Sequence, residues 1–143
     1  MSDFELAARA VIIKNGRMLL CKPVDKDWYF FPGGHVEFGE KTEDALAREL
    51  NEEMNIVPED ISFIGLIENR FERDNEKYHE IDVVFKVGIG SQEISEREDH
   101  IGFEWVDIES LKEKQALPIA LKDAIIEWMS DGKAFWGSEE IPE

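Results

Sequence analysis

The sequence predicts an α/β sandwich built around a mixed β-sheet. Short apolar runs typical of strands lie on both sides of a helix-forming segment at residues 43–54. The Asn15-Gly16 dipeptide fits a tight hairpin turn, and an amphipathic pattern at residues 119–129 predicts a closing helix. Strands interspersed with helices in this way usually form a sheet that helices cover.

The N-terminal third reads as a hairpin followed by an aromatic strand. Residues 6–13 and 18–21 are apolar and flank Asn15-Gly16, the pair that a type I′ turn prefers. Residues 28–31 form a short aromatic run that stops at Pro32. Alternation puts Trp28 and Phe30 on one face of this strand, so this pair is a candidate for lining a substrate pocket.

The remaining segments supply the rest of the sheet. Residues 61–71 and 78–87 are expected to pair as antiparallel strands around a charged loop at 72–77, with a bulge or close approach at Gly65. Residues 91–100 read as a polar loop, 103–106 as a strand and 109–114 as a short helix. Pro118 suits the first position of the closing helix. The acidic residues 133–143 form a tail that we separate from a domain at 1–132.

The central helix carries a patch of carboxylates. Thr42 is a candidate N-cap, and an apolar stripe faces the core. Residues three and four apart are neighbours on a helix, so Glu49, Glu52 and Glu53 share one patch that a single Arg48 cannot neutralise. Such a patch is either a solvated surface or a site for hard divalent cations, which prefer oxygen ligands.

The flanking residues favour the cation site. The chain reads Gly34, five residues, Glu40, seven residues, Arg48-Glu49-Leu50, one residue, Glu52-Glu53, and then Asn55-Ile56. This pattern resembles the signature of the Nudix (MutT-like) hydrolases, in which a glycine stands where this chain has Asn55. Asparagine is the next choice after glycine for a left-handed residue that ends a helix, so Asn55 is predicted to adopt that conformation.

The resemblance implies a fold, an activity and a metal. Nudix proteins are α-β-α sandwiches, and Nudix pyrophosphohydrolases cut a nucleoside diphosphate-linked substrate within its diphosphate by attack of water at phosphorus. We therefore expect Mg²⁺, with Mn²⁺ as a substitute, and a small nucleotide substrate. A catalytically silent Nudix-fold binding or sensor module is the alternative. A calcium-binding protein is disfavoured because no EF-hand loop pattern occurs.

The resemblance also assigns residues. Glu49, Glu52 and Glu53 are the expected metal ligands, together with the carbonyl of Gly33. Glu52, Glu53 and Arg48 are the expected catalytic residues, with Arg48 orienting the glutamates and Glu40 as a candidate partner. The general base is Glu52, Glu53 or a distal residue such as Glu98, which is also a possible metal ligand.

Composition narrows the partners. The 143 residues suit one domain, and 16 basic against 33 acidic residues give a net charge of −17, which repels nucleic-acid duplexes and anionic membranes. Cys21 is the only cysteine and excludes an intrachain disulfide, as expected in a reducing compartment. With no signal-like or transmembrane run, a cytoplasmic location is predicted. A homodimer is left open, as are the nucleotide and its leaving group.

Overall fold

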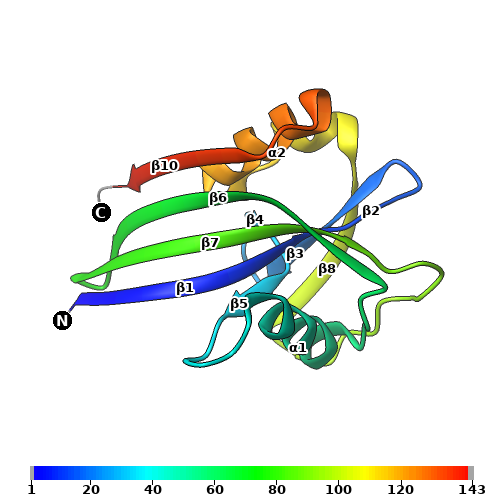
Figure 1. Ribbon diagram of the computed structural model, residues 1–143, viewed down its shortest axis with the longest axis horizontal. Coiled ribbons are helices and arrows are strands. Elements are labelled where there is room, and N and C mark those ends of the chain that lie inside the picture. Colours follow the sequence, from blue (N-terminus) through cyan, green and yellow to red (C-terminus); the bar gives the residue numbers. More distant parts are fainter. Residues whose placement is uncertain (1, 142–143) are drawn as a thin grey trace.

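The computed structural model, which describes residues 2–141, places two β-sheets between two helices (Figure 1). The first sheet has the order β10-β6-β7-β1-β5, with β1 (Ser2–Val11), β5 (Gly33–His35), β6 (Asp60–Arg73), β7 (Glu76–Gly88) and β10 (Phe135–Ile141). The second contains β2 (Ile13–Lys14), β3 (Arg17–Pro23), β4 (Tyr29–Phe30), β8 (Ile101–Asp107) and β9 (Ala116–Leu117). Both sheets mix parallel and antiparallel pairs, which confirms the predicted class.

The helices cover opposite faces and create two cores. Helix α1 (Thr42–Met54) buries Leu46, Leu50 and Met54 in one core. Helix α2 (Ile119–Asp131) buries Leu121 and Ile125 in the other, beside the short 3₁₀ helix η1 (Ile108–Glu113). Between residues 2 and 141, neither helix is long and apolar enough to cross a membrane.

Two tight turns define the hairpins. Asn15 and Gly16 both have positive φ, 54° and 75°, as the predicted turn between β2 and β3 requires. The charged loop predicted at 72–77 is shorter than expected, because β6 and β7 pair as far as Arg73 and Glu76. Only Asp74 and Asn75, also at positive φ, make that turn. The expected bulge is present, as a register shift between Phe63 and Gly65.

Two helix starts differ from the prediction. Lys41, not Thr42, is the N-cap of α1, and no side chain caps it, so Thr42 is the first helical residue. Pro118 is the N-cap of α2 instead of its first helical residue. Both corrections move the helix boundary by one residue. Helix ends are not defined more precisely than this by sequence patterns.

The end of α1 confirms the prediction for Asn55. Its φ of 56° and ψ of 39° are left-handed, and its N–H and that of Ile56 donate to the carbonyls of Asn51 and Leu50. The Asn55 side chain adds a contact that the sequence did not indicate, because its Oδ1 accepts a hydrogen bond from Arg97 Nη2 at 2.6 Å. Asparagine here both ends the helix and holds the following loop.

We expect Asn55→Val to lower the free energy of unfolding by about 1–2 kcal/mol, because a β-branched residue fits φ > 0 poorly. Asn55→Gly should change it by less than about 0.5 kcal/mol, since glycine keeps the backbone but loses the exposed bond to Arg97. Urea unfolding of both variants measures this. Equal costs for valine and glycine would contradict the role of the left-handed conformation.

The C-terminal segment predicted as an acidic tail contains β10, which pairs in parallel with β6 from Phe135 to Ile141. Gly65 makes this possible. A side chain at Gly65 would overlap the Phe135 ring, so the bare backbone of β6 leaves the space that Phe135 fills.

Candidate active site

The three glutamates of the patch lie together on α1 but differ in exposure. The side chain of Glu52 is 54% exposed and that of Glu49 is 18% exposed, whereas Glu53 as a residue is only 7% exposed. The carboxylates of Glu49 and Glu53 lie against each other. The patch therefore runs from solvent at Glu52 into the protein at Glu53.

Arg48 holds this patch in place from one side. Its guanidinium binds both oxygens of Glu40, at 2.9 and 3.0 Å, which confirms Glu40 as its partner. Arg48 Nη1 also donates to Glu49 at 3.0 Å, and Nη2 donates to the carbonyl of His35 at 3.1 Å. A planar fork bound on several sides fixes the Glu49 carboxylate and ties α1 to the loop before it.

Glu53 is a buried acid that forms no ion pair with a lysine, arginine or histidine of the described residues. Its Oε2 has no hydrogen-bond partner among the described residues. Burial raises the pKa of Glu53 to about 8, and repulsion from Glu49 and Glu98 acts in the same direction. A buried carboxylate next to other carboxylates is costly unless a proton or a metal neutralises it.

The two glycines before the helix allow a close backbone approach. Gly33 is buried at φ 137°, in register with Arg9 of β1, and Gly34 lies against Glu49 of α1. A Cβ on Gly34 would lie 2.5 Å from the carboxylate carbon of Glu49. Only glycine therefore brings this strand edge against the carboxylates.

Glu98 lies on the loop that closes the C-terminal end of α1. Backbone N–H groups of Ser95 and Arg97 donate to the carbonyls of Met54 and Glu53, at 3.1 and 3.0 Å. Glu98 is half-buried, raises the pKa of Glu53 by repulsion, and lies 3.2 Å from His100. The structure thus brings this distal acid close to the patch.

Trp28 and Phe30 line a cavity of about 540 Å³, their rings 6.0 Å apart. Phe71 and Tyr78 also line it and stack with their ring centroids 5.0 Å apart, and the Arg73 guanidinium lies 4.9 Å from the centroid of the Tyr78 ring. Asn69 also lines the cavity, and its buried Oδ1 has no hydrogen-bond partner among the described residues. The remaining lining residues are Glu5, Arg9, His35, Glu72, Glu80, Leu117 and Pro118.

Arg9 connects this cavity with the glutamate patch, and the sequence analysis did not identify it. It lines the cavity, donates to the Phe31 carbonyl at 3.2 Å and lies 3.5 Å from Asp82, and its charge lowers the pKa of Glu53. The available signal was a lone arginine in the apolar run 6–13. Glu80 and Asp82 gave a similar signal, as acids at alternate positions of a strand.

Asp82 is fully buried, and burial raises the pKa of its carboxyl from 3.8 to about 8. The folded protein then binds a proton that the unfolded chain releases, so stability should fall as the pH rises from about 4 to about 8.

We expect Asp82→Asn to raise the free energy of unfolding at pH 8 by about 1–3 kcal/mol, because the neutral amide avoids the buried charge and has N–H groups to donate to Glu80. The gain should shrink at pH 5. Urea unfolding at both pH values, in chelator, measures it. A gain that is equal at both pH values would contradict the titration of Asp82 as its cause.

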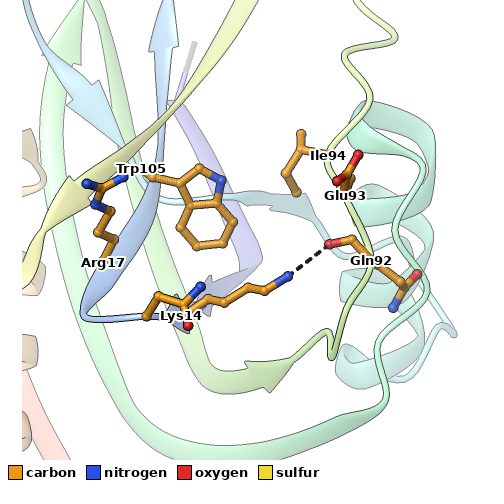
Figure 2. Close-up of a pocket in the computed structure, with 7 residues that line it drawn as sticks. Lys14, Arg17, Gln92, Glu93, Ile94 and Trp105 are labelled. Atoms are coloured by element: carbon orange, nitrogen blue, oxygen red, sulfur yellow. Dashed lines mark hydrogen bonds between the residues drawn. The ribbon is translucent and has the colours of Figure 1, made fainter.

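A second cavity, of about 660 Å³, lies between the β2–β3 turn and residues 92–94, with Lys14, Arg17 and Trp105 among its lining residues (Figure 2). Lys14 crosses it and donates to the carbonyl of Gln92 at 3.4 Å. Of the described residues that line it, none is a predicted site residue.

Comparison with known proteins identifies the family. A family model of the NUDIX domain matches residues 3–129. The chain belongs to this family. This Nudix protein is 32% identical over 114 residues to the nucleoside triphosphatase NudI of Escherichia fergusonii, covering 71% of its own length and 80% of that protein. It is 31% identical over 109 residues to the ADP-ribose pyrophosphatase of Methanocaldococcus jannaschii, covering 74% of its own length and 63% of the archaeal protein.

The chain thus spans less than two thirds of that archaeal relative. Among solved structures, a MutT protein from Bacillus halodurans aligns with a TM-score of 0.77 at 19% identity. The alignment covers 96% of this chain and 90% of the Bacillus protein. At this identity the likeness shows the fold alone, and the fold is that expected for the Nudix family.

Proposed function

We propose that this Nudix protein is a metal-dependent pyrophosphohydrolase. It cleaves a small nucleoside diphosphate-linked substrate within the diphosphate, by attack of water at phosphorus. Glu49, Glu52, Glu53 and the carbonyl of Gly33 hold Mg²⁺, for which Mn²⁺ substitutes.

The observation that carries this proposal is the buried, unpartnered carboxylate oxygen of Glu53 beside Glu49. A solvated acidic face would leave its carboxylates in water, whereas Glu53 is withdrawn from it. The donor set of carboxylates and a carbonyl fits a hard divalent cation. The chain keeps every carboxylate of the Nudix signature, Glu40, Glu49, Glu52 and Glu53, which disfavours a silent binding module.

Each residue then has a defined task. Arg48 fixes the Glu49 carboxylate and binds the His35 carbonyl of β5, the strand that carries Gly33, and so reduces the rearrangement needed when a metal binds. Bound divalent cations neutralise charge on the diphosphate and acidify water. Glu52, the most exposed of the three glutamates, and Glu98, on the loop that closes the end of α1, are the candidates to accept the proton of the attacking water.

The neighbouring cavity supplies the nucleoside site. Four aromatic side chains offer faces on which a base can stack, and the Asn69 amide offers one donor and one acceptor for its edge. Arg9 joins the cavity to the patch, so a base held there places its phosphates toward the carboxylates. Relatives that act on ADP-ribose and nucleoside triphosphates make both classes candidate substrates.

The decisive experiment is a panel of nucleoside triphosphates, nucleotide sugars, ADP-ribose and dinucleoside polyphosphates, incubated with Mg²⁺ and resolved by anion-exchange chromatography. Cleavage within the diphosphate of at least one substrate is expected. A panel that binds but stays intact would instead identify a nucleotide-binding module.

Turnover should fall below detection in excess chelator and return with added Mg²⁺ or Mn²⁺, because the site offers oxygen ligands and no thiolate. Circular dichroism of the chelated protein provides the control for folding. Hydrolysis that persists in chelator would reject metal dependence.

A further inference from the structure

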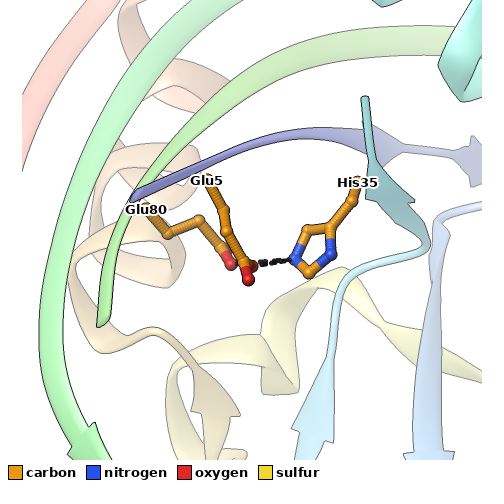
Figure 3. A group of neighbouring side chains, drawn as sticks. All are labelled: Glu5, His35 and Glu80. Carbon is orange, nitrogen blue, oxygen red and sulfur yellow. Dashed lines mark hydrogen bonds and ion pairs between the residues drawn. The ribbon is translucent and has the colours of Figure 1, made fainter. Parts of the chain in front are cut away.

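A second group of metal-ligating side chains lies outside the glutamate patch (Figure 3). Glu5 of β1, His35 of β5 and Glu80 of β7 point toward one another, and one ligand atom from each lies within 4.8 Å of the others. His35 Nε2 is 2.5 Å from Glu5 Oε2 and 3.4 Å from Glu80 Oε2. All three line the 540 Å³ cavity.

The sheet fixes this arrangement. Strand β1 lies between β5 and β7, with Glu5 in register with Glu80 and Ala7 in register with His35. Residues in register project to the same face of a sheet, so the three side chains share one face. The pairing of the strands holds the backbone beneath them in place. Side-chain exposure of 29% for Glu5, 56% for His35 and 12% for Glu80 leaves the group open to the cavity.

Asp82 supplies an independent sign that a cation belongs here. It is fully buried, contacts Glu80, and neither of its carboxylate oxygens accepts a hydrogen bond from a described residue. Arg9 is the nearby cation, with its Nε 3.5 Å from Asp82 and its Nη2 3.8 Å from Glu80. Three carboxyl groups, those of Glu5, Glu80 and Asp82, therefore face a single guanidinium, so this group of side chains favours a further positive charge.

We propose that Glu5, His35 and Glu80 form a second divalent-cation site, separate from the glutamates of α1. An imidazole nitrogen with two carboxylates favours a first-row transition ion such as Mn²⁺ over Mg²⁺, which prefers oxygen ligands. The open side of the site faces the cavity, where water or an oxygen of a bound nucleotide completes the coordination.

The test measures Mn²⁺ binding directly and is independent of turnover. The triple variant Glu49→Gln/Glu52→Gln/Glu53→Gln removes the carboxylates of α1. Electron paramagnetic resonance titration should still detect about one bound Mn²⁺ per chain. Its electron spin echo modulation should show coupling to an imidazole nitrogen, and excess Mg²⁺ should not displace it.

Adding His35→Ala to the triple variant should weaken Mn²⁺ binding at least tenfold and abolish the nitrogen coupling. His79→Ala is the matched control, because His79 pairs with a single carboxylate, Glu68, at 2.7 Å and should leave binding unchanged. The proposal is overturned if the triple variant binds no Mn²⁺, or binds it without nitrogen coupling. Both of these results come from the triple variant, so they are obtained even if the His35 variant does not fold. Neither result tests whether the intact protein hydrolyses its substrate.

Discussion

Glu53→Gln is expected to reduce turnover at least 10³-fold at saturating Mg²⁺ while making the metal-free protein more stable. The loss follows from its position, since Glu53 is the buried member of the patch proposed to hold the metal ion that neutralises the diphosphate. Glutamine keeps the shape but offers a neutral, weaker ligand. Single-turnover rates with the best substrate of the panel measure the loss.

The gain in stability has a separate cause. The pKa of Glu53 is raised to about 8 from an ordinary value of 4.5, so folding without metal forces a proton onto it across this interval. Stability of the wild type therefore falls as the pH rises from about 4.5 to about 8. In chelator, the free energy of unfolding of Glu53→Gln should exceed that of the wild type by about 1–2 kcal/mol at pH 8, and by less at pH 5.

Two comparisons isolate the patch from general effects of charge. Glu52→Gln should also lose most turnover, but it should gain little stability because its carboxylate is exposed. Glu43→Gln, on the exposed first turn of the same helix, should alter neither property. Near-wild-type turnover of Glu53→Gln would contradict its assigned role as a metal ligand.

Local patterns predicted the parts of the fold that local geometry determines. The spacing of Leu46, Leu50 and Met54 predicted α1, Asn15-Gly16 predicted its turn, and Asn55 predicted the left-handed helix end. The sequence analysis did not predict strand β10, because β10 pairs with β6, some 70 residues earlier. That pairing also depends on Gly65, where the absence of a side chain leaves room for Phe135. Nothing in the acidic composition of residues 133–143 indicates that pairing.

The site divides in the same way. One helix presents Glu49, Glu52 and Glu53, so fixed spacing was enough to find them. The cavity wall instead combines residues of β1, β5 and β7, whose adjacency depends on the order of strands in the sheet. Charges at Arg9 and Asp82 within apolar strands were the available signal of a buried polar cluster, and the sequence analysis assigned them no role.

Gly33→Ala is the substitution for which we expect the largest loss of stability, about 3 kcal/mol or more. Its φ of 137° lies in a region that only glycine adopts readily. An added Cβ would also overlap the backbone carbonyl of Ala8 on the adjacent strand, which cannot move aside without breaking the β1–β5 pairing. Strain and overlap therefore add at this position.

Gly39→Ala separates these two costs. Gly39 also has a positive φ, 84°, but a Cβ there meets no described atom within 4 Å, so only backbone strain of about 1 kcal/mol is expected. Urea unfolding of both variants gives the difference, which is the cost of the overlap at Gly33. If Gly33→Ala lost no more stability than Gly39→Ala, β5 would have to shift away from Ala8 at little cost. A strand edge that yields could not hold the Gly33 carbonyl in place for a metal ion.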